Sequence, residues 1–124
     1  MNDLQIAGSQ TTPTITSDSQ KGLLCMRGES YPENAFALYS PVFHWLEQYF
    51  STPEQALRLE LELVYLNTSS IKALMDIFDM LEAAYNDGHD ISVVWYYDAN
   101  NDRVGELATE FREDFSFAFD IVSR

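Results

Sequence analysis

The hydrophobic pattern changes its period within the stretch from Leu57 to Tyr85, and this change constrains the fold more than any other feature of the chain. The first part alternates apolar and polar side chains, which predicts a β-strand that buries Leu57, Leu59, Leu61, Leu63 and Tyr65 on one face. The second part repeats at steps of three and four residues, which predicts an amphipathic helix with a buried stripe of Ile71, Leu74, Met75, Phe78, Leu81 and Tyr85. We expect this helix to end at Asn86-Asp87-Gly88, where glycine favours a left-handed stop.

Four polar residues, Asn67, Thr68, Ser69 and Ser70, separate the strand from the helix. Side chains of this kind cap helices, and the simplest interpretation is that they do only that. However, a helix that begins directly after a buried strand points free N–H groups and its positive dipole end at the turn. The turn is therefore also a candidate anion site. The anion could be the phosphate of a bound nucleotide or a phosphoryl group carried by a hydroxyl of the turn itself.

The segment before this stretch predicts a hairpin and a helix. Leu4 and Ile6 could form a short edge strand, and the runs 14–18 and 23–27 have the spacing of two strands joined by a loop. A helix should then run to about Phe50, with Ser30 as a possible cap and Pro41 as a source of a kink. Its expected stripe is Phe36, Leu38 or Tyr39, Val42 or Phe43, Leu46 and Phe50.

The segment after Gly88 predicts two strands around a short helix. Residues 91–97 alternate as a strand, and residues 98–102 form a turn. The short helix should bury Val104, Leu107, Ala108 and Phe111. The last strand should bury Phe115, Phe117, Phe119 and Ile121.

The order of elements is therefore β-β-α-β-α-β-α-β, which predicts an α/β fold with a mixed sheet and right-handed crossovers between parallel strands. Only one face of each late strand is strongly apolar, so the helices should lie mainly on one side of the sheet. We expect a single domain over residues 1–124, with residues 1–12 loosely held. Thr68 then lies at the C-terminal edge of a central parallel strand, where such sheets place binding sites.

Charge and composition exclude several classes of function. Seven Lys and Arg against 20 Asp and Glu give a formal net charge of -13, which disfavours binding to nucleic acid or to an anionic membrane. No apolar run approaches the roughly 20 residues of a membrane helix, and the N-terminus lacks the pattern of a signal peptide. A single cysteine, Cys25, excludes an internal disulfide, and we interpret it as a small core residue in a cytoplasmic protein.

No motif in the chain predicts catalysis, a metal or a cofactor. Ser69 and Lys72 formally match the S-x-x-K pattern of serine acyl-transfer enzymes, but the companion motifs of that pattern are absent. His44 and His89 have no partner at a ligand spacing, so we expect both at the surface or rim. The three acidic residues Asp76, Asp79 and Glu82 share one helix face, which is more typical of a solvated surface than of a metal site.

Two resemblances bear on function. The order of elements, with hydroxyls at the cap of the helix after the third predicted strand, resembles the STAS domain of bacterial anti-anti-sigma factors. In those proteins an Asp-Ser pair carries the phosphorylated serine, and Asn67-Thr68 matches it here. A closer resemblance, to the SiaC family of regulatory phosphoproteins, covers nearly the whole chain. Its motifs are the segments Gly28-Glu29-Ser30-Tyr31-Pro32-Glu33-Asn34, Tyr65-Leu66-Asn67-Thr68-Ser69-Ser70-Ile71-Lys72 and Trp95-Tyr96-Tyr97-Asp98.

The resemblance implies a non-enzymatic signalling protein that is switched by phosphorylation of Thr68. The implied partners are a serine/threonine protein kinase, a PP2C-type phosphatase and a diguanylate cyclase. The unphosphorylated form would bind and activate the cyclase, controlling the synthesis of c-di-GMP and with it biofilm formation and aggregation. The implied partner-binding residues are Tyr31, Glu33, Asn34, Tyr65, Asn67, Thr68, Ser69, Ser70 and Lys72. The alternative is a small-ligand or nucleotide-binding domain that uses the same helix N-terminus as an anion site.

Overall fold

The computed structural model describes residues 1–124 as one six-stranded sheet and three helices. The strands lie side by side in the order in which they occur in the sequence. The elements are β1 (Gln5–Ile6), β2 (Thr14–Asp18), β3 (Leu23–Ser30), α1 (Ala35–Tyr49), β4 (Leu57–Leu66), α2 (Thr68–Asn86), β5 (Ile91–Tyr97), α3 (Asp102–Glu113) and β6 (Ala118–Ser123).

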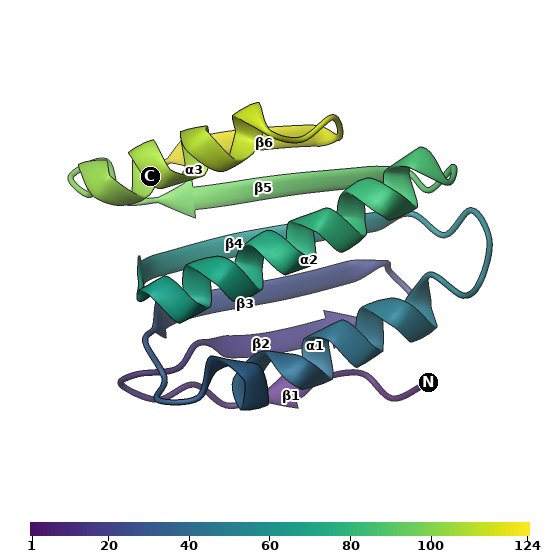
Figure 1. The fold of residues 1–124 in the computed structure, drawn as a ribbon, viewed down its shortest axis with the longest axis horizontal. Helices are drawn as coiled ribbons and strands as arrows, with labels where there is room; N and C mark the ends of the chain where they lie inside the picture. The colour runs from purple at the N-terminus through teal and green to yellow at the C-terminus, as the bar shows by residue number, and fades with distance from the viewer.

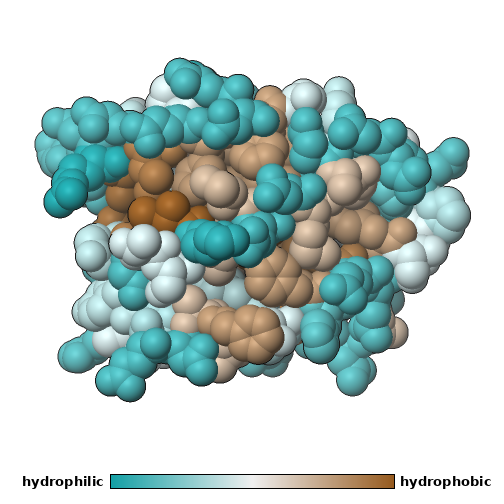
Figure 2. All heavy atoms as spheres, in the orientation of Figure 1, coloured by the Kyte–Doolittle hydropathy of each residue, from teal (hydrophilic) through white to brown (hydrophobic).

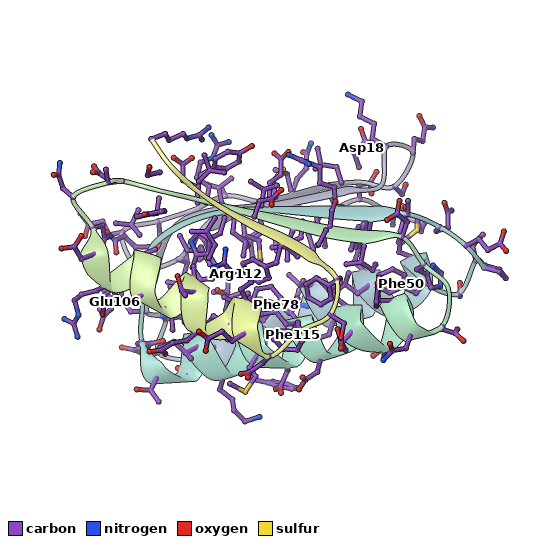
Figure 3. All side chains as sticks on the ribbon, turned by 90° about the horizontal axis from the view of Figure 1, so that it is seen from above. Asp18, Phe50, Phe78, Glu106, Arg112 and Phe115 are labelled. Carbon is purple, nitrogen blue, oxygen red and sulfur yellow. The ribbon has the colours of Figure 1, made fainter.

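The sheet is mixed, as predicted. Strands β1 to β3 pair antiparallel, whereas β3 to β6 pair parallel through the helical crossovers. All three helices lie on one face of the sheet and leave the other face uncovered (Figures 1 and 3). The α/β class and the placement of the helices are confirmed, and β1 is the short edge strand that Leu4 and Ile6 indicated but that the predicted order left out.

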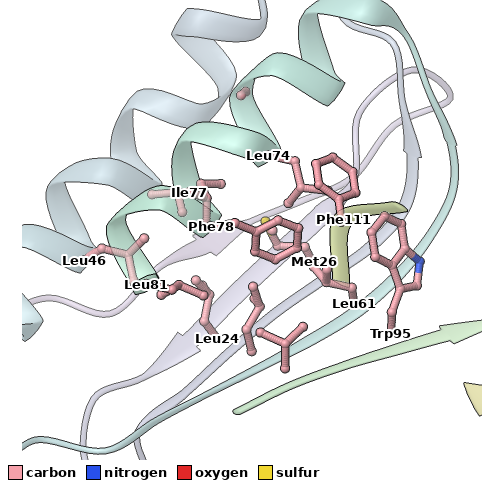
Figure 4. Packing of buried hydrophobic residues seen from close by; sticks show 14 of the residues in the cluster. Leu24, Met26, Leu46, Leu61, Leu74, Ile77, Phe78, Leu81, Trp95 and Phe111 are labelled. Carbon is pink, nitrogen blue, oxygen red and sulfur yellow. The ribbon is translucent and has the colours of Figure 1, made fainter. Parts of the chain in front are cut away.

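The hydrophobic core fills the layer between the sheet and the helices. Leu61 of β4 points into it, and Phe78 of α2 lies fully buried near its centre (Figure 4). The Phe78 ring is 5.1 Å from the ring of Phe111 on α3 and 5.4 Å from that of Phe119 on β6. These contacts fix α2 and α3 on the sheet, and thereby fix where the N-terminus of α2 lies.

A β-bulge near the end of β4 reverses part of the predicted alternation. Gly28 of β3 is paired with Leu63, but the next residue of β3 is paired with Tyr65, so Val64 is the extra residue. A bulge of this kind turns the following side chains to the opposite faces. Leu66 is therefore buried, whereas Tyr65, predicted on the buried face, is 49% exposed.

Helix α1 begins later than the sequence pattern indicated. Asn34 is its N-cap, with Oδ1 accepting a hydrogen bond from the Ala37 N–H at 3.0 Å, and Ser30 is instead the buried last residue of β3. The prediction of a Ser30 cap was therefore wrong. Phe36 was also wrongly placed on the buried stripe, because the helix starts with Ala35 on its inner face and leaves Phe36 77% exposed. Pro41 does lie inside the helix.

Helix α2 ends where it was predicted to end, but its buried face is rotated slightly. Gly88 follows it with a φ of 102°, the left-handed region that favours glycine. Met75 and Tyr85 were predicted on the stripe, yet they are 41% and 40% exposed, whereas Ala73 and Ala84 are buried. The buried face consists of Ser70, Ala73, Leu74, Ile77, Phe78, Leu81 and Ala84.

Two further expectations are corrected by the packing. Cys25 lies on the helix-free face of the sheet, because its neighbours Leu24 and Met26 take the inward positions of β3. It is half-buried there, with Sγ donating to Glu60 Oε1 at 3.8 Å. His89, expected at the surface, is buried and has Nδ1 within 2.8 Å of the Gln55 carbonyl oxygen.

A buried cluster of three hydroxyls joins β3, α1 and α2 directly below the predicted site. The Ser30 hydroxyl donates to Ser70 Oγ at 2.8 Å and is paired with the Tyr39 hydroxyl at 2.6 Å. All three side chains are fully buried. Burial raises the pKa of the Tyr39 phenol above its ordinary value, against the opposing effect of hydrogen bonds with Ser30 and Ser70. The cluster is therefore uncharged near neutral pH.

The cluster predicts a graded loss of stability. Ser30→Ala removes the central hydroxyl and both contacts, so we expect its free energy of unfolding to fall by about 2 kcal/mol, whereas Ser70→Ala should lose about 1 kcal/mol. The exposed neighbour Ser69 is the control, and Ser69→Ala should stay within about 0.5 kcal/mol of wild type. Urea unfolding of the three variants measures these values. Equal losses for Ser30→Ala and Ser69→Ala would contradict the structural role of the cluster.

Candidate functional site

The turn between β4 and α2, residues 67–70, is fixed in place by the side chain and the backbone of Asn67. Its Oδ1 accepts a hydrogen bond from the Ser70 N–H at 3.0 Å, which makes Asn67 the N-cap of α2. Its Nδ2 donates to the Pro32 carbonyl oxygen at 3.3 Å, and its backbone N–H donates to the Ser30 carbonyl oxygen at 3.0 Å. A single residue thus joins the turn to the loop that leads into α1.

An asparagine suits this position better than the aspartate of the anti-anti-sigma pattern. Either side chain could accept the hydrogen bond from Ser70 N–H and cap the helix. Only the carboxamide of Asn67 also has an N–H to donate to the Pro32 carbonyl oxygen. An ionised carboxylate at the same distance would repel that oxygen. The structure therefore gives a local reason for the asparagine.

The three hydroxyls of the turn have different surroundings. Ser70 is buried in the cluster with Ser30, and the Ser69 hydroxyl donates to Asn67 Oδ1 at 3.3 Å. Thr68 is exposed at the first position of α2, and its hydroxyl takes part in no side-chain hydrogen bond. Of these three residues, Thr68 alone is exposed and also has a hydroxyl free of side-chain hydrogen bonds.

The electrostatics at this end of α2 favour a negative charge. The first turn of α2 contains no acidic residue, whereas the first turn of α3 contains Asp102. The partial positive charge of the α2 N-terminus is thus not offset by its own side chains. One turn further along, Lys72 Nζ is paired with Asp76 Oδ1 at 3.2 Å in an exposed ion pair. An exposed pair of this kind contributes little to stability and can exchange partners readily.

The residues predicted for partner binding fall into two neighbouring groups. Tyr31, Glu33 and Asn34 lie on the loop before α1, and the others lie on or beside the turn. The rings of Tyr31 and Tyr65 meet edge to face with centroids 5.6 Å apart, and both side chains are substantially exposed. With the hydrogen bond from Asn67 to Pro32, this contact brings the two segments together. Ser70 alone is buried, so it supports the turn from below.

Sequence reasoning missed a groove of about 290 Å³ beside the turn. The groove lies between the end of β4, the first turn of α2 and helix α3, and includes Tyr65, Ile71, Arg103 and Leu107. No local pattern could reveal it, because its walls come from segments that are separated in the sequence. The only hint of the groove in the sequence was Val64, an apolar residue on the otherwise polar face of the predicted strand.

The two residues of the S-x-x-K match, Ser69 and Lys72, are each paired with another side chain. The Lys72 ammonium is paired with Asp76 and the Ser69 hydroxyl with Asn67, so the S-x-x-K match has no activating contact. No group of three or more His, Cys, Asp or Glu side chains is placed to hold a metal ion. None of the helices is both long enough and apolar enough to cross a membrane. The arrangement can present one free hydroxyl next to an exposed aromatic surface.

Comparison with known proteins gives a consistent result over almost the whole chain. The model of the family described as SiaC family regulatory phosphoprotein matches residues 6–124. An uncharacterized protein of Pseudomonas aeruginosa (strain UCBPP-PA14) is 53% identical over 121 residues, which cover 98% of this chain and 96% of that protein.

Solved structures agree with this match. Apo-SiaC from Pseudomonas aeruginosa has a TM-score of 0.94 and 52% identity, covering 98% of this chain and 99% of that one. A second structure, of the diguanylate cyclase SiaD in complex with its activator SiaC from the same organism, contains a chain with a TM-score of 0.95 and 52% identity. That match covers 98% of this chain and 100% of the other. By sequence and by structure, the chain belongs to the SiaC family of regulatory phosphoproteins.

Proposed function

We propose that this chain is a non-enzymatic switch whose unphosphorylated form binds and activates a diguanylate cyclase and so controls c-di-GMP synthesis, with biofilm formation and aggregation as the downstream outputs. A serine/threonine protein kinase would phosphorylate Thr68, and a PP2C-type phosphatase would restore the hydroxyl. The observation that carries the proposal is the exposed Thr68 hydroxyl at a helix N-terminus without acidic residues. The complex of the related SiaC with the cyclase SiaD supports the choice of partner.

The covalent step requires only the hydroxyl of Thr68 from this chain. The oxygen Oγ1 forms a bond to the γ-phosphorus of ATP, ADP leaves, and the kinase takes the hydroxyl proton. In the reverse step, water attacks the phosphorus, and inorganic phosphate leaves as Thr68 recovers its proton. Both catalysts act in trans, which agrees with the lack of paired catalytic groups near the turn.

The domain should tolerate the phosphoryl group without refolding. Phosphorylation adds about 1.5 to 2 negative charges near neutral pH, and a helix N-terminus stabilises such charge. Lys72 lies one turn from Thr68 and could exchange Asp76 for the phosphate. The cap made by Asn67 and the buried cluster below it do not involve the Thr68 side chain.

A partner that packs against the unmodified turn would no longer fit once Thr68 is phosphorylated. The added group is bulky and highly charged, and it would have to be desolvated beside the exposed rings of Tyr31 and Tyr65. Burying an unpaired charge costs several kcal/mol. Phosphorylation should therefore block the cyclase by local exclusion. The proposal includes a cytoplasmic location, which the free thiol of Cys25 favours.

The alternative of a nucleotide site receives no specific support. The residues that line the groove include neither Asn67 nor the three hydroxyls of the turn, and Arg103 is their only cation. A nucleotide phosphate at the α2 N-terminus would thus lie outside the cavity that its base would need. A thermal shift with nucleotides, without a phosphoryl adduct on the protein, would favour this alternative.

Replacing the acceptor should abolish the modification without harming the fold. Thr68→Ala removes an exposed side chain that neither caps α2 nor contacts the core, so its free energy of unfolding should stay within about 0.5 kcal/mol of wild type. Incubation with the cognate kinase and ATP should add about 80 Da, the mass of one phosphoryl group, to wild type and to Ser69→Ala but not to Thr68→Ala. Intact-mass spectrometry measures this. A full adduct on Thr68→Ala would move the acceptor to another residue.

Phosphorylation should weaken cyclase binding while leaving the distant parts of the domain unchanged. We expect at least a tenfold higher dissociation constant for the Thr68-phosphorylated protein, because several kcal/mol of desolvation oppose its binding. Titration of the cyclase with both forms gives the affinities, and amide NMR spectra of both forms report the structural change. Equal affinities would contradict the switch. Large spectral changes in β1 or at the C-terminal end of α2 would contradict local exclusion alone.

A further inference from the structure

A hollow of about 530 Å³ lies at the opposite end of α2 from Thr68. Helices α1 and α2 run in the same direction, so their C-terminal ends lie at the same side of the molecule (Figure 1). The hollow is formed between these two helix ends, and we call it the helix-end hollow. Helix α2 has 19 residues and is about 28 Å long, so the hollow is well separated from the turn that carries Thr68.

The turn after α2 places His89 in the wall of this hollow. Gly88 has a φ of 102°, and this left-handed residue turns the chain back so that the His89 N–H donates to the Ala84 carbonyl oxygen at 3.0 Å. His89 is then only 4% exposed, and its ring lies 4.8 Å from the ring of Phe50, the C-cap of α1. Two aromatic rings therefore form one side of the hollow.

The imidazole of His89 has one ring nitrogen without a partner in the protein. Nδ1 lies 2.8 Å from the Gln55 carbonyl oxygen, which can only accept, so in the neutral ring Nδ1 carries the proton and Nε2 is a bare acceptor. The one fully enclosed side-chain nitrogen or oxygen that lacks a partner is Trp95 Nε1. Nε2 of His89 is therefore not enclosed, and it opens to the hollow that His89 lines. Buried polar groups are normally satisfied, so this acceptor suits a ligand that brings an N–H group.

The charge around the hollow is negative. Glu47 and Asp87 are exposed, and no salt bridge involves either carboxylate. The C-termini of α1 and α2 add partial negative charge, and neither helix has a basic residue in its last turn, whereas α3 has Arg112 there. No Lys or Arg lines the hollow. The surroundings thus favour a cation, and Nε2 favours a cation that can donate a hydrogen bond.

We propose that the helix-end hollow is a binding site for a small aliphatic amine, a diamine or polyamine in its ammonium form. An ammonium N–H would donate to His89 Nε2, and the carboxylates of Glu47 and Asp87 would balance the charge. The methylene chain would pack on Met80 and on the ring of Phe50, whose face also attracts cations. Figure 2 shows a hydrophobic area toward the right, between the two helix ends, with hydrophilic side chains around it.

The residues of the hollow select an ammonium group over a metal ion. No three His, Cys, Asp or Glu side chains converge to hold a metal, and Phe50 and Met80 offer no oxygen ligand to a divalent cation such as Mg²⁺. The volume of about 530 Å³ lies within the range of small-molecule sites. The site is independent of the proposed switch, because none of its residues belongs to the turn between β4 and α2.

Titration with putrescine tests the inference, with matched compounds as controls. Amide spectra of isotope-labelled protein give the affinity, and the imidazole nitrogen resonances of His89 report the contact at Nε2. Putrescine should bind saturably and shift the Nε2 resonance. The uncharged 1,4-butanediol should not bind, and tetramethylammonium, which has no N–H, should leave the Nε2 resonance unchanged. Displacement of putrescine by Mg²⁺ at the same ionic strength would show binding to surface charge alone and would overturn the site.

Substitutions locate the amine on the protein. Glu47→Gln and Asp87→Asn remove charge at exposed positions of the hollow, and each should raise the dissociation constant about threefold. His89→Phe keeps a ring beside Phe50 but removes the acceptor, so we expect an increase of about tenfold. Glu113→Gln removes the same charge from an exposed position of α3 outside the hollow and should remain within about twofold of wild type.

Three outcomes would contradict the inference. The first is the absence of saturable binding, and the second is equal affinity of the Glu47→Gln, Asp87→Asn and Glu113→Gln variants. The third is tighter binding of Nα-acetyl-lysinamide than of putrescine, which would indicate a lysine side chain of another protein as the ligand. If His89→Phe does not fold, the two exposed variants and the Nε2 resonance of the wild-type protein decide.

Discussion

The carboxamide of Asn67 is the contact on which the geometry of the site depends. It caps α2 through Ser70 N–H and at the same time holds the loop before α1 through the Pro32 carbonyl oxygen. Because the cap is supplied by Asn67, the hydroxyl of Thr68 is not needed for folding. A residue that is free of a structural role can be modified and restored without unfolding the helix that carries it. The proposed switch requires this separation, because the residue that is phosphorylated must not also hold the fold together.

The bulge at Val64 has a comparable effect on the surface. Without it, the alternation along β4 would place the ring of Tyr65 on the face towards the core. With it, Tyr65 joins Tyr31 at the surface, Leu66 fills the core and Val64 lines the groove. One extra residue in the strand thus places apolar side chains at the surface next to the proposed acceptor, Thr68. Bulges are common beside functional sites for this reason.

Helices α2 and α3 differ in the charged residues that they place beside the turn. Helix α2 carries no acidic residue in its first turn, whereas α3 lines the neighbouring groove with Arg103, Glu106 and Glu110. The proposed phosphorylation of Thr68 would therefore place negative charge at a helix end that has none of its own.

The sequence alone determined the α/β class, the placement of helices on one face and the turn that carries Thr68, because hydrophobic period and capping residues are local properties. It also indicated the family through contiguous motifs, which the match over residues 6–124 confirms. It failed for Tyr65, Phe36 and His89, whose burial depends on a bulge, a helix start and a neighbouring loop.

Only the tertiary structure decided which hydroxyl of the turn is free and that a groove lies beside it. The burial of Ser70 depends on Ser30 and Tyr39, and the groove forms between two helices that are separated by a whole strand in the sequence. Contacts between distant segments are set by how the helices pack on the sheet. No local pattern of residues contains that information.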